Sequence, residues 1–172
     1  MLPQHIQYIR LKLSENKELF KNLFSRINDE EIFWKPEPTA WCMLEILCHL
    51  CDEEQEDFRA RLNHVLTTPD APLPPIDPQG WVDSRKYMLQ DFDQKLNEFF
   101  TEREKSIEWL MNLENPQWDN YYEHPKFGKM SAKLFFTNWL AHDYLHIRQI
   151  IKLKFDYLKF ISKEDLNYAG NW

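Results

Sequence analysis

The sequence predicts an all-α protein, a four-helix bundle formed by one domain that spans residues 1–172. The ten prolines fall in four places, and because proline breaks helix interiors, the stretches between them are the candidate helices. Those stretches are residues 4–35, 39–68, 79–115 and 126–172. Apolar residues recur in them at intervals of three and four, and no segment of strand length shows strict apolar–polar alternation.

Each stretch carries its own apolar stripe. The first has Ile6, Ile9, Leu13, Phe20, Leu23 and Ile27, and the second begins near Trp41 and continues with Ile46, Leu50 and Phe58. The third has Met88, Phe92, Leu96, Phe99, Ile107 and Leu110, with Arg103 as one polar interruption. The fourth has a helix start signal at Ser131 and then Leu134, Phe135, Trp139, Leu140, Ile147 and Ile150. The terminal residues 160–172 are expected to form a short helix or a cap over the end of the bundle.

The connector at residues 67–82 bears on the topology. It is proline-rich, and about 16 residues at roughly 3.1 Å each reach about 50 Å. A helix of about 24 residues is only about 36 Å long. The connector therefore favours a return along the whole bundle, which makes the second and third helices parallel; a loose loop is the alternative.

Composition excludes several classes of protein. Lys and Arg number 21 against 28 Asp and Glu, and this net charge of −7 argues against nucleic-acid binding. The three glycines form neither GxGxxG nor a P-loop, so the common nucleotide-binding folds are not expected. No apolar run has the length of a membrane span, and the N-terminus lacks a signal-peptide pattern. These observations predict a soluble, cytoplasmic protein without a membrane partner.

The histidines are the candidate metal ligands. His142 and His146 lie four residues apart in HDYLH, so that two imidazoles on one helix face can reach one ion. This segment lacks the glutamate that serves as general base in zinc proteases. His49 is the best third ligand, because a histidine among Leu and Ile is costly without a partner. Each of these histidines has a plainer interpretation, as an ordinary surface or core residue.

Side chains near the histidines are candidates for supporting roles. Glu45, Glu53 and Glu56 lie within about 40° of His49 on one helix face, where an acid can hold the second imidazole nitrogen or act as a general base. Gln149, nearly one turn beyond His146, can reach a ligand or a bound water. The Cys48–Cys51 pair matches the CxxC pattern of redox and zinc sites, but without a predicted strand both cysteines are interpreted as helix-packing residues.

Three segments together resemble the DinB-like (YfiT-like) family of four-helix metalloenzymes. They are residues 34–54 (WKPEPTAWCMLEILCHLCDEE), 128–131 (GKMS) and 142–150 (HDYLHIRQI). Cys42 departs from the pattern, since the family usually has a helix-capping Ser there. The resemblance implies an up-down-down-up bundle, frequent homodimers, and one divalent metal held by His49, His142 and His146. Three neutral histidines leave coordination sites open, and zinc or nickel fits such a set.

Three functions follow as hypotheses, each with a small-molecule substrate where it is enzymatic. The first, implied by the resemblance, is a metal-dependent S-transferase that uses a low-molecular-weight thiol such as bacillithiol or mycothiol. Arg59 or Arg61 is then a candidate for binding a carboxylate of the thiol. A salt-bridged role at the surface is the alternative for both arginines. The second is a metal-dependent hydrolase in which Glu53 or Gln149 orients a water molecule. The third is a stress-linked bundle that binds metal without catalysis.

Overall fold

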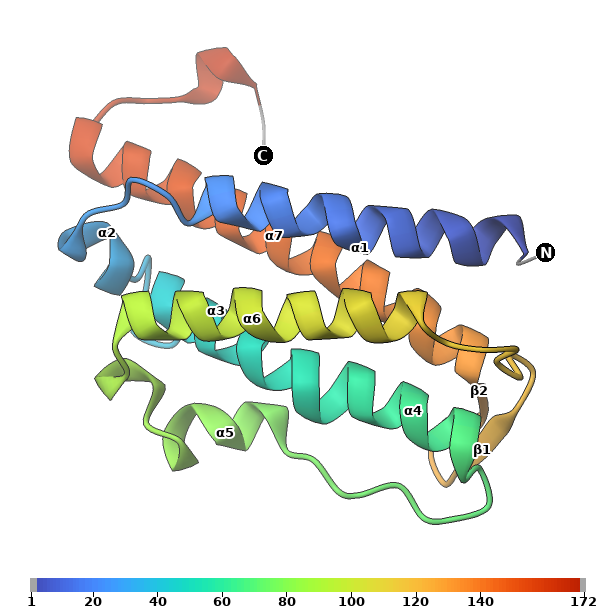
Figure 1. Cartoon of the computed structure of the whole chain (residues 1–172). Helices are drawn as coiled ribbons and strands as arrows, with labels where there is room; N and C mark the ends of the chain where they lie inside the picture. Colours follow the sequence, from blue (N-terminus) through green and yellow to red (C-terminus); the bar gives the residue numbers. More distant parts are fainter. Residues whose placement is uncertain (1–2, 171–172) are drawn as a thin grey trace.

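Four long helical segments form the molecule in a computed structural model that describes residues 3–170. The segments are α1 (Gln4–Leu23), a continuous second helix built from α3 (Met43–Asp52), the π-helix η1 (Glu53–Arg59) and α4 (Ala60–Thr67), then α6 (Phe92–Met111) and α7 (Ala132–Ser162). Segments α1 and α7 run in one direction, and α3–α4 and α6 run in the other (Figure 1). This is the predicted up-down-down-up bundle, with the second and third helices parallel.

The connection between these parallel helices is longer than the sequence predicted. It spans residues 68–91, returns along the bundle, and contains α5 (Pro78–Ser84) and the 3₁₀ turn η2 (Tyr87–Leu89) (Figure 1). The third helix therefore begins only at Phe92, after Asp91, whose side chain accepts a hydrogen bond from the Gln94 backbone N–H at 2.7 Å. Met88, which the periodicity placed on the third helix, lies in η2 instead.

Local capping residues explain where the other helices begin. The Ser131 Oγ accepts a hydrogen bond from the Leu134 N–H at 3.1 Å, so the predicted start of the last helix is confirmed. At the start of α3, the Glu45 carboxylate accepts from the Cys42 backbone N–H at 2.9 Å. That half of a capping box is present even though Cys42 replaces the usual hydroxyl residue. The short α2 (Asp29–Phe33) is capped as α7 is: the Asn28 side-chain oxygen accepts a hydrogen bond from the Glu31 backbone N–H at 2.9 Å.

The core divides into two clusters within the bundle and one beneath the crossover. Trp139 and Phe136 lie in the first, Phe20 and Phe99 in the second. In the third, Trp81 of α5 and aromatic and aliphatic neighbours cover the outer face of α3. Cys48 and Cys51 are completely buried in these clusters, as expected for packing residues.

One expectation about the remaining segments needs correction, and the expectation of a short C-terminal helix or a cap is met only in its first alternative. A short antiparallel hairpin, β1 (Tyr121–His124) with β2 (Gly128–Ser131), precedes α7 although no strand was predicted. Its strands have four residues each and are only half-buried, too short for a recognisable alternation. The C-terminal segment forms a 3₁₀ turn, η3 (Asn167–Ala169), but Tyr168 is wholly exposed and the described residues 163–170 do not cover the bundle end. Among the described helices, none has both the length and the hydropathy needed to cross a membrane.

Candidate metal centre

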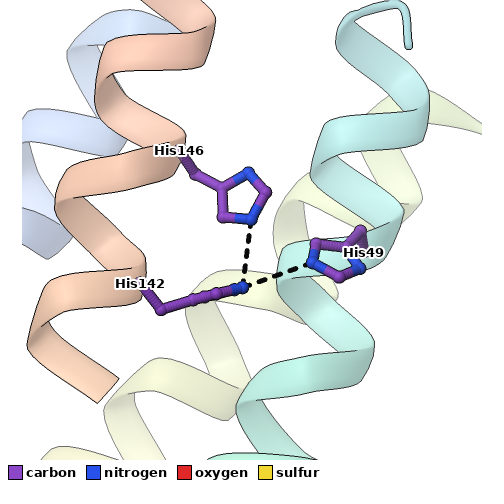
Figure 2. A group of neighbouring side chains, drawn as sticks. All are labelled: His49, His142 and His146. Carbon is purple, nitrogen blue, oxygen red and sulfur yellow. Dashed lines mark hydrogen bonds between the residues drawn. The ribbon is translucent and has the colours of Figure 1, made fainter. Parts of the chain in front are cut away.

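Three imidazoles from two helices converge in one place (Figure 2). The Nε2 atom of His142 lies 3.3 Å from Nε2 of His49 and 3.0 Å from Nε2 of His146. All three ligand atoms lie within 4.8 Å of one another, and this is the one such cluster of potential metal ligands that the described residues form. The set that the sequence singled out is thus brought together in space.

The helices fix this arrangement from both sides. His142 and His146 share one face of α7 because they are four residues apart. His49 faces them from α3, with its ring 4.9 Å from the ring of Trp41. The ring of Phe58, from η1, lies 4.8 Å from the ring of His142. Aromatic rings therefore pack against two of the three imidazoles, those of His49 and His142.

The donor set and its spacing fit a divalent transition-metal ion. Two imidazole nitrogens at 2.0–2.1 Å from one ion, at angles of about 90–110°, are separated by about 2.8–3.4 Å. Two of the three nitrogen–nitrogen separations, 3.0 and 3.3 Å, lie in that range, and the third pair, His49 with His146, lies within 4.8 Å. Three protein ligands also leave coordination positions for substrate, as catalytic sites do.

The histidines are held in the neutral form that coordinates metal. Burial lowers the pKa of His49 to about 3 and that of His142 to about 2, with the neighbouring histidines contributing further. Burial also lowers the pKa of His146, partly opposed by its hydrogen bond to Gln149. Neutral imidazoles at these separations can share an Nε2–H proton or, with their Nδ1 atoms protonated, present Nε2 lone pairs that a cation can bind.

The second ring nitrogens differ in their partners. Nδ1 of His146 lies 2.8 Å from Oε1 of Gln149, so that Nδ1–H donates and the Nε2 lone pair faces the other histidines. Gln149 therefore orients the ring of His146. Nδ1 of His49 is buried and has no hydrogen-bond partner among residues 3–170.

The histidines line a cavity of about 620 Å³. Loop residues 36 and 39–41 form one side, Gln79 from α5 another, and the C-terminal half of α7 a third. On α7, Lys152 and Asp156 form an ion pair at the wall of this cavity. The volume suits a small organic molecule and places it beside the histidine cluster.

Glu53 also lines this cavity. Its side chain is 4 % exposed, and its Oε1 has no hydrogen-bond partner within the described chain. Burial raises the pKa of Glu53 well above its usual range, and the adjacent Asp57 carboxyl raises it further. Glu53 is thus a carboxyl beside the cluster whose surroundings favour its protonated form, at the place where a general base or a water-orienting residue was expected.

The other acidic candidates near His49 serve structural roles. Glu45 caps α3 and pairs with Lys35, 2.8 Å away, while Glu56 forms a two-pronged ion pair with Arg85 at 2.7 and 2.9 Å. Arg85 belongs to the crossover, so Glu56 helps to fasten it to the second helix.

Arg59 and Arg61 do not reach the cavity. Arg59 binds the carbonyl oxygen of Glu102 at 3.0 Å and also the Glu102 carboxylate. Arg61 lies 2.9 Å from the Asp57 carboxylate and donates to the Pro74 carbonyl at 3.1 Å, which anchors the crossover. Both arginines have the salt-bridged role rather than the cofactor-binding role considered for them.

One group behind the histidines was missed. Arg103 of α6 is 1 % exposed and bonds both oxygens of Asp143 at 2.7 Å, while its Nη2 lies 2.8 Å from Glu54. Two signals in the sequence point to it: an arginine within an apolar stripe, and an acid between two candidate ligands. Neither signal identifies the partner, since Arg103 and Asp143 are 40 residues apart.

Comparisons with known proteins agree with the fold. The YfiT protein of Bacillus subtilis, described as a probable metal-dependent hydrolase with an unusual four-helix bundle topology, superposes with a TM-score of 0.77. It is 17 % identical, and the match covers 89 % of this chain and 88 % of that one. No curated protein matches the sequence significantly. The family model of the DinB superfamily matches residues 12–150, most of the chain, and the protein therefore belongs to the DinB superfamily.

Proposed function

We propose that the protein is a divalent-metal-dependent enzyme that hydrolyses a small molecule, with His49, His142 and His146 as the ligands of one zinc or nickel ion. The observation that carries hydrolysis is Glu53, a buried carboxyl on the wall of the cavity that the three imidazoles line. It shares a hydrogen bond with Asp57, and its Oε1 has no hydrogen-bond partner among residues 3–170. The description of YfiT as a probable metal-dependent hydrolase supports the same reaction class, at the level of a shared fold.

The chain's residues divide the work as follows. The three imidazoles hold the ion, Gln149 keeps His146 in the coordinating tautomer, and Glu53 holds or accepts a proton at its carboxyl oxygen. When bound, the ion supplies Lewis-acid activation of a nucleophile and of the substrate's acceptor oxygen, and its positive charge opposes the rise in the pKa of Glu53. Trp41 and the loop before α3 form one side of the cavity in which the substrate would lie.

Thiol transfer is the second candidate. Its supporting observation is Lys152, the lysine on the cavity wall, which offers a charge partner for the carboxylate of a thiol cofactor. Asp156 already pairs with this lysine, and Arg59 and Arg61 are directed elsewhere, so the site has less cationic character than an anionic thiol requires. We therefore propose hydrolysis, rather than thiol transfer, as the reaction of this protein.

The test uses protein reconstituted with zinc or nickel and two substrate panels. We expect turnover of an ester or amide without added thiol, and its loss in Glu53→Gln with metal content retained. Glu56→Gln is the matched control, because it removes a carboxylate of the same segment that faces Arg85. Turnover only of an electrophile plus thiol, unaffected by Glu53→Gln, would establish the transferase instead. Full metal retention in His49→Ala would contradict the proposed ligand set.

We also propose that the protein is a homodimer. Apolar side chains on the outer face of α7, including Tyr144, Ile151 and Leu158, are 41–49 % exposed, and the neighbouring α1 adds Tyr8 and Leu11. Such a row of apolar residues on adjacent helices is typical of an interface. Light scattering should give a dimer mass for the wild type and a monomer mass for Ile151→Lys; a monomeric wild type contradicts the proposal.

A further inference from the structure

We propose that Arg103 is a positioning residue for the histidine cluster, which sets the distance between His49 and the two histidines of α7. The inference rests on the proposed metal-binding role of these histidines. It concerns a group that touches none of them and lies on a third helix, α6.

The guanidinium connects the two segments that carry the ligands. On one side, both Asp143 oxygens lie 2.7 Å from the Arg103 nitrogens, and Asp143 is the residue after His142. On the other side, Arg103 Nη2 lies 2.8 Å from the carboxylate of Glu54, five residues after His49. The planar guanidinium of Arg103 therefore joins α7 to the second helix.

Further hydrogen bonds fix both carboxylates. Asn16 of α1 donates to Asp143 at 3.0 Å, and the Trp139 indole N–H donates to Glu54 at 3.0 Å. All five side chains are at most 4 % exposed. Each of the four long helical segments contributes at least one of these side chains, so the network links the positions of all four segments. The three histidines lie on two of these segments, the second helix and α7.

Stability alone does not account for this arrangement. Removing three ionisable groups from water is costly, and burial raises the pKa of the Glu54 carboxyl. Well-packed apolar residues commonly give equal or greater stability in place of such a cluster. The surroundings would suit apolar residues, since the rings of Phe20 and Phe99 lie 5.9 and 5.5 Å from the guanidinium carbon. The planar guanidinium group of an arginine, with its N–H donors in fixed directions, additionally fixes the geometry between its partners.

The cluster needs such precision. Metal–ligand distances vary by only about 0.2 Å in functional sites. A shift of α3 relative to α7 by about 1 Å would therefore remove His49 from coordination. Residues that orient ligands commonly change metal affinity 10- to 100-fold when replaced.

The primary variant is Arg103→Lys, which keeps the charge but loses the two-pronged geometry. The second is the triple variant Glu54→Gln, Arg103→Met, Asp143→Asn, which removes all three charges together and leaves an amide oxygen for the Trp139 and Asn16 donors. The control is Glu31→Gln with Lys154→Met, which removes another ion pair that joins α7 to a different helix, at 3.0 Å. Cobalt(II) is the probe, because its affinity and its visible absorption spectrum both report the coordination of the ligands.

We expect cobalt to bind Arg103→Lys and the triple variant at least tenfold more weakly than the wild type, with an altered spectrum and unchanged far-ultraviolet circular dichroism. The control variant should match the wild type. A role in stability alone predicts a lower melting temperature of the metal-free variants with unchanged affinity and spectrum, and that result in a folded variant would overturn the inference. If Arg103→Lys does not fold, the triple variant decides. A wild type that binds no cobalt would contradict the metal site itself, which is a separate outcome.

Discussion

The histidine cluster should make the metal-free protein sensitive to mild acid. Burial lowers the pKa of His49 to about 3 and of His142 to about 2, whereas an unfolded histidine titrates near 6.5. Between these values the unfolded chain binds protons that the folded protein does not. The stabilising contribution is therefore complete above about pH 6.5 and is lost progressively as the pH falls toward the folded pKa values.

The size of the effect follows from linkage. Between pH 7 and pH 5, each of the two histidines should lower the free energy of unfolding by about 2 kcal/mol, or about 4 kcal/mol together. Glu53 acts in the opposite direction, because its raised pKa lets the folded protein hold a proton that the unfolded chain releases. The total pH dependence therefore mixes both signs, and a comparison of variants is needed to isolate the histidines.

The assay is urea unfolding in the presence of a chelator, at pH 7 and pH 5, for the wild type and for His49→Leu with His142→Leu. Glu53 and His146 are present in both proteins, so their contributions cancel to first order. We expect the wild type to lose about 4 kcal/mol more than the double variant between the two pH values. Equal losses in the two proteins would refute the argument that these histidines are held neutral by burial.

Two further predictions concern single side chains. Gln149→Met removes the hydrogen bond to His146 Nδ1 and should weaken metal binding about tenfold in a competition titration. The control is Lys152→Met, on the same helix and cavity, which should leave the affinity unchanged. Equal affinities of the two variants would argue against the orienting role of Gln149. Trp81→Ala removes a ring that is 8 % exposed, is stacked under Arg85 and holds the crossover against α3. This variant should lower the free energy of urea unfolding by about 3–5 kcal/mol. A loss below about 1 kcal/mol would show that the crossover is not part of the cooperative core.

The resemblance to a known family and the local patterns together account for the bundle and for the three histidines that lie together. Prolines delimit helices by local steric rules, and the i, i+4 spacing places His142 and His146 on one face wherever α7 lies. Connector length constrains topology through the reach of the chain, which is why parallel second and third helices followed from residues 67–82 even though their boundaries did not. The sequence did not predict the hairpin, because its two strands are too short to show a recognisable apolar–polar alternation.

Tertiary packing decided what each polar side chain does. Glu53 and Glu56 are three residues apart and both acidic, yet one lines the cavity and the other pairs with Arg85, because only the first faces α7 across the histidines. Arg59 is directed to α6, and Arg103 to Asp143, by neighbours that lie about 40 residues away along the chain. A sequence by itself determines which side chains share a helix face. Their partners depend on how the faces of separate helices meet, because a charged group is held by whichever opposite charge or donor the packed core brings within hydrogen-bond reach.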